Sequence, residues 1–97
     1  MTNALSQRGK AQLDLGRAQD AAGSYTEARR LGARVGVPLL QGIAALGQAK
    51  ALDALGDRAQ ALTAARDAVT FAEAADDPVR LTEATALVTN WSTSPES

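Results

Sequence analysis

The chain has 97 residues, a formal net charge of −1, and 45% hydrophobic and 22% charged residues, which is the composition of one globular domain. It contains no cysteine and no histidine, which excludes disulfides, thiolate metal sites and the commonest general base. Its first ten residues, MTNALSQRGK, lack the apolar run of a signal peptide, and no segment approaches the roughly 18 apolar residues of a membrane span, so we expect a cytoplasmic chain without a membrane partner.

The apolar content is unusual because 22 residues are alanine and only three are aromatic. Alanine lets helices approach closely but buries little area, so we expect a thin core and a narrow stability margin. Residues 1–40 carry six basic and three acidic side chains, and residues 41–97 carry four and eight. This asymmetry is typical of a solvated surface, although it also suits end-to-end stacking of subunits. The pI near 5.2 argues against a nucleic-acid partner.

Glycine and proline divide the chain into five predicted helices, since the residues between them favour helix and never alternate as a strand does. The first helix is expected over 3–15, and Gly16 ends it in a left-handed turn. The second is expected over 18–35. The predicted buried positions of these two helices are Leu5, Gly9, Leu13, Ala21, Ala22, Tyr25, Ala28 and Leu31.

The third helix is expected over 38–55, because Pro38 suits a first helical turn. The fourth is expected over 58–75, where Asp57 and Gln60 form a capping-box pattern. Their predicted buried positions are Ile43, Leu46, Ala49, Leu52, Ala61, Leu62, Ala65, Ala68, Val69 and Ala72, with Phe71 left open.

The fifth helix is expected over 78–91, with Asp77 as its N-cap and Pro78 in its first turn. Its apolar side carries Leu81, Ala84, Val88 and Trp91. Links of two or three residues make consecutive helices antiparallel neighbours. The expected fold class is therefore all-α: two αα-hairpins and a C-terminal capping helix over residues 1–92, followed by a disordered tail over 93–97.

Several positions recur after 40 residues, and they are the ones that shape a hairpin. The recurring pairs are Leu15 and Leu55, Gly16 and Gly56, Ala21 and Ala61, Ala28 and Ala68, and Pro38 and Pro78. Glycine permits the tight reversal, and alanine permits the close approach of the paired helices. The pattern predicts two hairpins of the same construction stacked side by side.

This set of residues resembles the tetratricopeptide repeat, whose motif has glycine at the turn, alanine five residues on, a bulky residue at nine and alanine at twelve. The first copy reads Gly16, Ala21, Tyr25 and Ala28, and the second reads Gly56, Ala61, Ala65 and Ala68. The period of 40 rather than 34 resembles long-period arrays of bacterial transcription regulators and kinesin light chains. The resemblance implies an αα-hairpin superhelix that binds a protein or peptide.

No residue pattern indicates catalysis. Asp76 and Asp77 precede Pro78 and are interpreted as a helix end followed by an N-cap. Ser24 and Thr26 have no histidine to activate them. The basic cluster 29–34 is interpreted as a solvated helix face, and no phosphate-binding loop occurs. We therefore expect a protein that is not an enzyme and takes neither cofactor nor metal.

In the resembled family, the first helix of each hairpin lines a concave partner groove. This implies the groove residues Asn3, Ser6, Lys10, Leu13, Ile43, Leu46, Lys50, Asp53, Glu83, Ala86 and Asn90. Lys10, Lys50 and Asn90 occupy the same place in successive units, which leaves open a peptide-carboxylate clamp, a mixed apolar groove with peripheral lysines, or merely solvated lysines. The expected function is a peptide- or protein-binding module, in a bacterial setting the interaction part of a regulator. The alternative is a self-association domain, a homo-oligomer without an external ligand.

Overall fold

The computed structural model describes residues 2–92, so the predicted tail over 93–97 lies outside the described residues. Five helices and no strand make up this part of the chain: α1 (Thr2–Asp14), α2 (Ala18–Val35), α3 (Pro38–Ala54), α4 (Arg58–Ala75) and α5 (Pro78–Ser92). The predicted helices are confirmed, and no predicted bound differs from the observed one by more than one residue. None of these helices combines the length and apolarity that crossing a bilayer requires.

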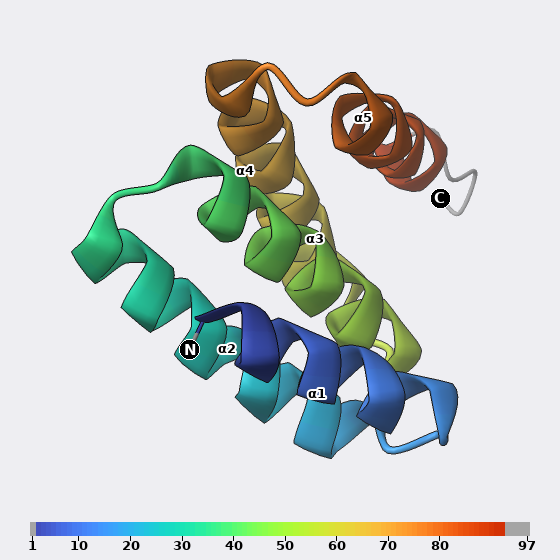
Figure 1. Cartoon of the computed structure of the whole chain (residues 1–97). Coiled ribbons are helices and arrows are strands. Elements are labelled where there is room, and N and C mark those ends of the chain that lie inside the picture. Colours follow the sequence, from blue (N-terminus) through green and yellow to red (C-terminus); the bar gives the residue numbers. More distant parts are fainter. Residues whose placement is uncertain (1, 93–97) are drawn as a thin grey trace.

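The helices form two antiparallel hairpins, α1–α2 and α3–α4, and α5 packs against α4 (Figure 1). Helix α3 lies at the centre, because α2 covers one of its sides and α4 covers the other. Helices α1 and α5 each touch α3, whereas α2 and α4 make no close backbone contact with each other. The chain is thus a two-layer all-α fold, with α1, α3 and α5 in one layer and α2 and α4 in the other.

The two hairpin turns have the same backbone construction. Gly16 and Gly56 both take a left-handed φ, 80° and 84°, which glycine adopts without a steric cost. The Gly16 N–H donates to the carbonyl of Leu13 at 3.0 Å, and the Gly56 N–H donates to that of Asp53 at 2.9 Å. Every other hydrogen bond of the first turn likewise recurs 40 residues on.

The links that lead into α3 and α5 are also alike. Gly36 ends α2 with a φ of 74°, and Asp76 ends α4 with a φ of 55°, both left-handed. Asp76 is the one non-glycine residue with positive φ in the described part of the chain, a conformation that aspartate tolerates better than most side chains. The interpretation of Asp76 as a helix end is confirmed, and the left-handed helix ends at Gly36 and Asp76 recur with the 40-residue period.

Two aspartates cap the helices that follow their turns. The Asp57 carboxylate accepts a hydrogen bond from the Gln60 N–H at 3.1 Å at the start of α4. The Asp77 carboxylate accepts one from the Arg80 N–H at 3.3 Å at the start of α5. Both predicted N-caps are therefore confirmed, and each satisfies a backbone donor that the first turn of a helix leaves without a partner.

Alanine fills most of the core, and no large side chain is completely buried. The buried residues form three clusters: Ala21, Tyr25 and Ala51; Ala45, Leu46, Ala68 and Ala84; and Ala49, Ala64 and Ala65. Leu87, Val88 and Trp91 of α5 pack against the third cluster, so α5 covers the outer side of α4 and α3. Some predicted buried positions are only half-buried and belong to none of these clusters, which corrects their assignment: Leu5, Leu31, Ile43, Leu62 and Leu81.

Tyr25 joins the two layers by inserting between two glycines. A Cβ added to Gly47 would lie 2.0 Å from the ring atom Cε1, and one added to Gly9 would lie 2.8 Å from Cε2. The ring therefore fills the space that side chains on α1 and α3 would otherwise take.

At the three positions that lie 40 residues later, in the second repeat unit, the large and small side chains are exchanged. Ala65 replaces Tyr25, Ala49 replaces Gly9, and Leu87 replaces Gly47. Leu87 packs against the cluster that contains Ala49 and Ala65. The large side chain of the second unit therefore comes from α5, the helix that follows the hairpin, whereas that of the first unit comes from α2, within the hairpin. The two units thus fill equivalent space with different residues, which explains why the second copy lacks the bulky residue of the first.

Candidate functional site

A hollow of about 390 Å³ opens on the layer formed by α1, α3 and α5, and we call it the front hollow. Its lining residues are Lys10, Leu13, Asp14, Tyr25, Ile43, Leu46, Gly47, Lys50, Arg80 and Glu83. The buried Tyr25, Leu46 and Gly47 and the half-buried Leu13 and Ile43 form an apolar floor. Charged side chains from all three helices surround this floor.

The structure brings six of the predicted groove residues together in the front hollow: Lys10, Leu13, Ile43, Leu46, Lys50 and Glu83. Ser6 is buried, 4% exposed, and does not line it. Asp53 instead pairs with Arg58 at 2.8 Å, and Asn90 is exposed outside the lining. The side chain of Asn3 lies outside the described ones.

Four lining residues were missed by the sequence analysis: Asp14, Tyr25, Gly47 and Arg80. Tyr25 was assigned to a buried stripe on the second helix, which lies in the other layer. The signal that could have found it is glycine in the middle of a helix, at Gly9 and Gly47, because such glycines mark places where another group approaches closely.

The charged rim is compensated within the chain. The Lys10 Nζ lies 3.4 Å from the Asp14 carboxylate, and Lys50 forms an ion pair with Glu83 that connects α3 to α5. Arg80 donates to Asp77 at 2.8 Å, and this contact lowers the pKa of that carboxyl. The two aligned lysines therefore each face a carboxylate of this chain, and the rim presents paired charges around an apolar floor.

Tyr25 lines the front hollow although it lies on α2, in the other layer. Tyr25 starts on α2, and a Cβ on Gly47 or Gly9 would lie 2.2 or 3.0 Å from its ring atom Cζ. The ring therefore lies between the two glycines, and Tyr25 lines the hollow together with Asp14. Burial, and to a smaller extent the Asp14 carboxylate, raises the pKa of the Tyr25 hydroxyl above its ordinary value of 10.0.

We expect a spectrophotometric titration of phenolate absorbance to give a pKa above 10.0, and Tyr25 is the only tyrosine that contributes to it. Asp14→Asn should lower this pKa by removing the nearby negative charge. Because the pKa of the neutral phenol is higher in the folded than in the unfolded chain, protonated Tyr25 favours the folded state. This contribution to stability is fully present below the unfolded pKa and is lost as the pH rises through the folded pKa. A folded pKa at or below 10.0 would contradict the burial of the Tyr25 phenol.

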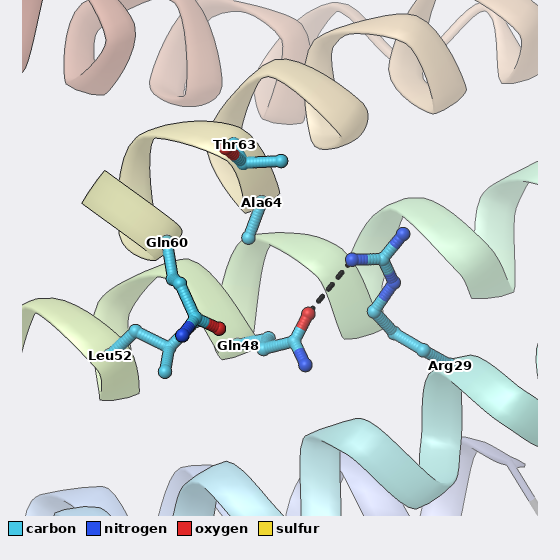
Figure 2. Close-up of a pocket in the computed structure, with 6 residues that line it drawn as sticks. All are labelled: Arg29, Gln48, Leu52, Gln60, Thr63 and Ala64. Carbon is cyan, nitrogen blue, oxygen red and sulfur yellow. Dashed lines mark hydrogen bonds between the residues drawn. The ribbon is translucent and has the colours of Figure 1, made fainter. Parts of the chain in front are cut away.

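A second pocket, of about 260 Å³, lies on the opposite layer and is lined by Arg29, Gln48, Leu52, Gln60, Thr63 and Ala64 (Figure 2). Arg29 donates to the Gln48 side-chain oxygen at 2.8 Å and to the Asp67 carboxylate at 3.0 Å. Since α2 and α4 make no close backbone contact with each other, the Arg29 side chain connects α2 to both α3 and α4. The interpretation of the basic cluster as a solvated face fits the exposed Arg30 and Arg34 but not Arg29.

The other polar groups that the sequence singled out serve local structure. The Ser24 hydroxyl donates to the Gln12 side chain at 2.7 Å, and the Thr26 hydroxyl donates to the carbonyl of Ala22 at 2.7 Å. Within residues 2–92, no three acidic side chains gather in a group that could hold a metal ion. The front hollow is thus the surface feature that most needs a functional explanation.

Comparison with known proteins gives no relative from which a function could be transferred. No protein-family model, no curated protein and no solved structure matches the chain. The geometry and chemistry of the front hollow therefore carry the functional interpretation.

Proposed function

We propose that the chain is a tetratricopeptide-like protein-interaction module, without enzymatic activity, whose front hollow binds a segment of a partner protein. The observation that carries this proposal is the apolar floor of Leu13, Ile43 and Leu46, which α1 and α3 build together and which lines an open hollow. Apolar side chains that line an open concavity are typical of surfaces that receive a partner.

The dimensions suit the side chains of a peptide. A hollow of about 390 Å³ falls within the roughly 300–1,000 Å³ typical of ligand clefts. An amphipathic helix presents apolar anchors at a spacing of three or four residues, and such a helix commonly docks in a groove between helices. The paired rim charges Lys10–Asp14 and Lys50–Glu83 would flank the docked segment.

The non-enzymatic part of the proposal rests on composition. Histidine and cysteine are absent, and the serine and threonine hydroxyls discussed above have structural partners. In a bacterial setting, a module of this kind would form the interaction part of a larger regulator.

Self-association is a second candidate, and one observation favours it. Four aliphatic side chains are exposed at the two turns that join α2 to α3 and α4 to α5: Val35, Val37, Leu39 and Val79. Figure 1 shows these two turns at the same end of the helix stack. A second copy that covers this end would bury the exposed aliphatics.

The test is binding of peptides selected from a display library of amphipathic helices, compared between Ile43→Glu and Val35→Glu. Ile43 lies on the floor of the front hollow, and its counterpart in α5 is Glu83, so glutamate is compatible with the helix there. We expect Ile43→Glu to weaken binding by at least about ten-fold, because a charge would face the apolar anchor.

Val35→Glu is the matched control, since it introduces the same charge at an exposed position outside the hollow. It should leave peptide binding unchanged. A wild-type dimer in sedimentation that Val35→Glu dissociates, with no peptide sensitive to Ile43→Glu, would instead support self-association and contradict the peptide-binding proposal.

A further inference from the structure

We propose that two copies of the chain associate through the end of the helix stack that carries the α2–α3 and α4–α5 links, residues 34–39 and 73–79, which we call the link end. A two-fold axis places the α2–α3 link of each copy on the α4–α5 link of the other. This inference rests on the second candidate of the proposed function, self-association, and specifies its interface. It is compatible with peptide binding, because no residue of the link end lines the front hollow.

The first support is apolar surface that the chain itself leaves uncovered. Val35 is 61% exposed and Val79 is 73% exposed, and Val37 and Leu39 are exposed beside them in sequence. Scattered exposed aliphatics are ordinary on protein surfaces, but these four gather on two links at the same end of the stack (Figure 1). A second copy seated on this end would remove them from water.

The second support is that the two links carry opposite charges. Arg34 is exposed in the last turn of α2, and Glu73 and Asp76 are exposed at the end of α4. None of these three forms an ion pair with another residue in the described range 2–92, whereas Asp77 on the second link is already paired with Arg80. The α2–α3 link is therefore positive and the α4–α5 link is negative.

These charges distinguish between the two ways in which a two-fold axis can bring identical ends together. If each link faced the same link of the second copy, arginine would face arginine and carboxylates would face carboxylates, which is unfavourable. If each link faces the other link, Arg34 of one copy meets Glu73 and Asp76 of the other, and this contact occurs twice. The contact involves only the ends of helices, so we expect a small interface and a weak, reversible dimer.

The experiment is sedimentation equilibrium of the whole chain at concentrations from about 10 µM to about 1 mM, because association through a small interface depends on concentration. Wild type should form a dimer and no larger species. Arg34→Glu should raise the dissociation constant at least about ten-fold, because it places like charges across the interface at two symmetric contacts.

The second link is changed with the double variant Glu73→Arg/Asp76→Gly. Glycine suits the left-handed φ of 55° at this position, as it does at Gly36 on the first link. This double variant should weaken the dimer in the same way as Arg34→Glu. Adding Arg34→Glu to it should restore dimerisation, because the opposite charges then meet again with their positions exchanged. A loss caused by misfolding would not be reversed in this way.

Arg66→Glu is the matched control, since it reverses the charge of an exposed arginine in the middle of α4 that has no ion pair among the residues described. It should leave the dissociation constant unchanged. Thermal melts by circular dichroism show that each variant is folded.

Three outcomes would overturn the link-end dimer. The first is a monomeric wild type at about 1 mM, a concentration at which even small specific interfaces associate. The second is a dimer that Arg34→Glu leaves as tight as wild type. The third is growth beyond a dimer, which would show that the link end binds the opposite end of the stack, where Leu15 and Leu55 are exposed, in an open head-to-tail assembly. None of these results decides peptide binding, which the Ile43→Glu comparison tests separately.

Discussion

Gly47→Ala should lower the free energy of unfolding by at least about 3 kcal/mol, at the upper end of the usual cost of overpacking. The added Cβ would lie 2.0 Å from Cε1 and 2.2 Å from Cζ of Tyr25, distances at which the ring or the backbone of α3 must move. Neither moves easily, because Gly9 confines the ring from the other side. Against a total stability of about 5–15 kcal/mol, this loss is large, and urea denaturation followed by circular dichroism would measure it.

Gly23→Ala is the matched control for this substitution. Gly23 also lies inside a helix, but a Cβ there would meet nothing within 4 Å. Because alanine favours helix over glycine by about 1 kcal/mol, this variant should be slightly more stable than wild type. Equal stability of Gly47→Ala and Gly23→Ala would show that Tyr25 does not lie between α1 and α3.

The residues of the second repeat unit suggest substitutions that would recover the stability lost in Gly47→Ala. Tyr25→Ala combined with Gly9→Ala and Gly47→Leu would reproduce the sizes found at Ala65, Ala49 and Leu87. We expect this triple variant to recover much of the stability lost in Gly47→Ala, because the large side chain would enter from α3 rather than from α2. Strong coupling among these positions would follow from their shared space.

The helices and the repeat were predictable because their signals are local. Glycine at 16, 36 and 56, proline at 38 and 78 and aspartate at 57 and 77 determine where each helix begins or ends, and turns and caps depend on a few neighbouring residues. Part of the groove followed from the same repeat, since aligning the turns places Lys10, Leu13, Ile43, Leu46 and Lys50 in one layer.

The floor and the charge pairing of the site were not predictable, because they depend on which side chains of different helices meet in the tertiary structure. Tyr25 belongs to the far layer by sequence, and only the tertiary positions of Gly9 and Gly47 let it enter the front hollow. Similarly, Lys50 meets Glu83 across two helices, a pairing that a single helical pattern does not specify. In alanine-rich helices the apolar stripe is also broad, so Leu62 could not be distinguished from a true core position.

Ala65→Asp should unfold the chain at room temperature. Ala65 is 0% exposed in a cluster with Ala49 and Ala64, and Leu87 and Trp91 close that cluster from α5. A carboxylate there would have neither room nor a polar partner, and burying an unpaired charge costs several kcal/mol. A thermal melt by circular dichroism would show a lost or strongly lowered transition.

Leu62→Asp separates this effect from a general loss of helix or a change in net charge. It introduces the same residue into α4, three positions earlier, where the side chain is half-buried and can turn toward water. We expect it to cost no more than about 1.5 kcal/mol, the range of substitutions outside the core. If the two variants melted at the same reduced temperature, the alanine face of α4 would not be the interior that joins α3 to α5. If Leu62→Asp were the more damaging, α4 would be rotated, and the stacking that forms the front hollow would have to be redrawn.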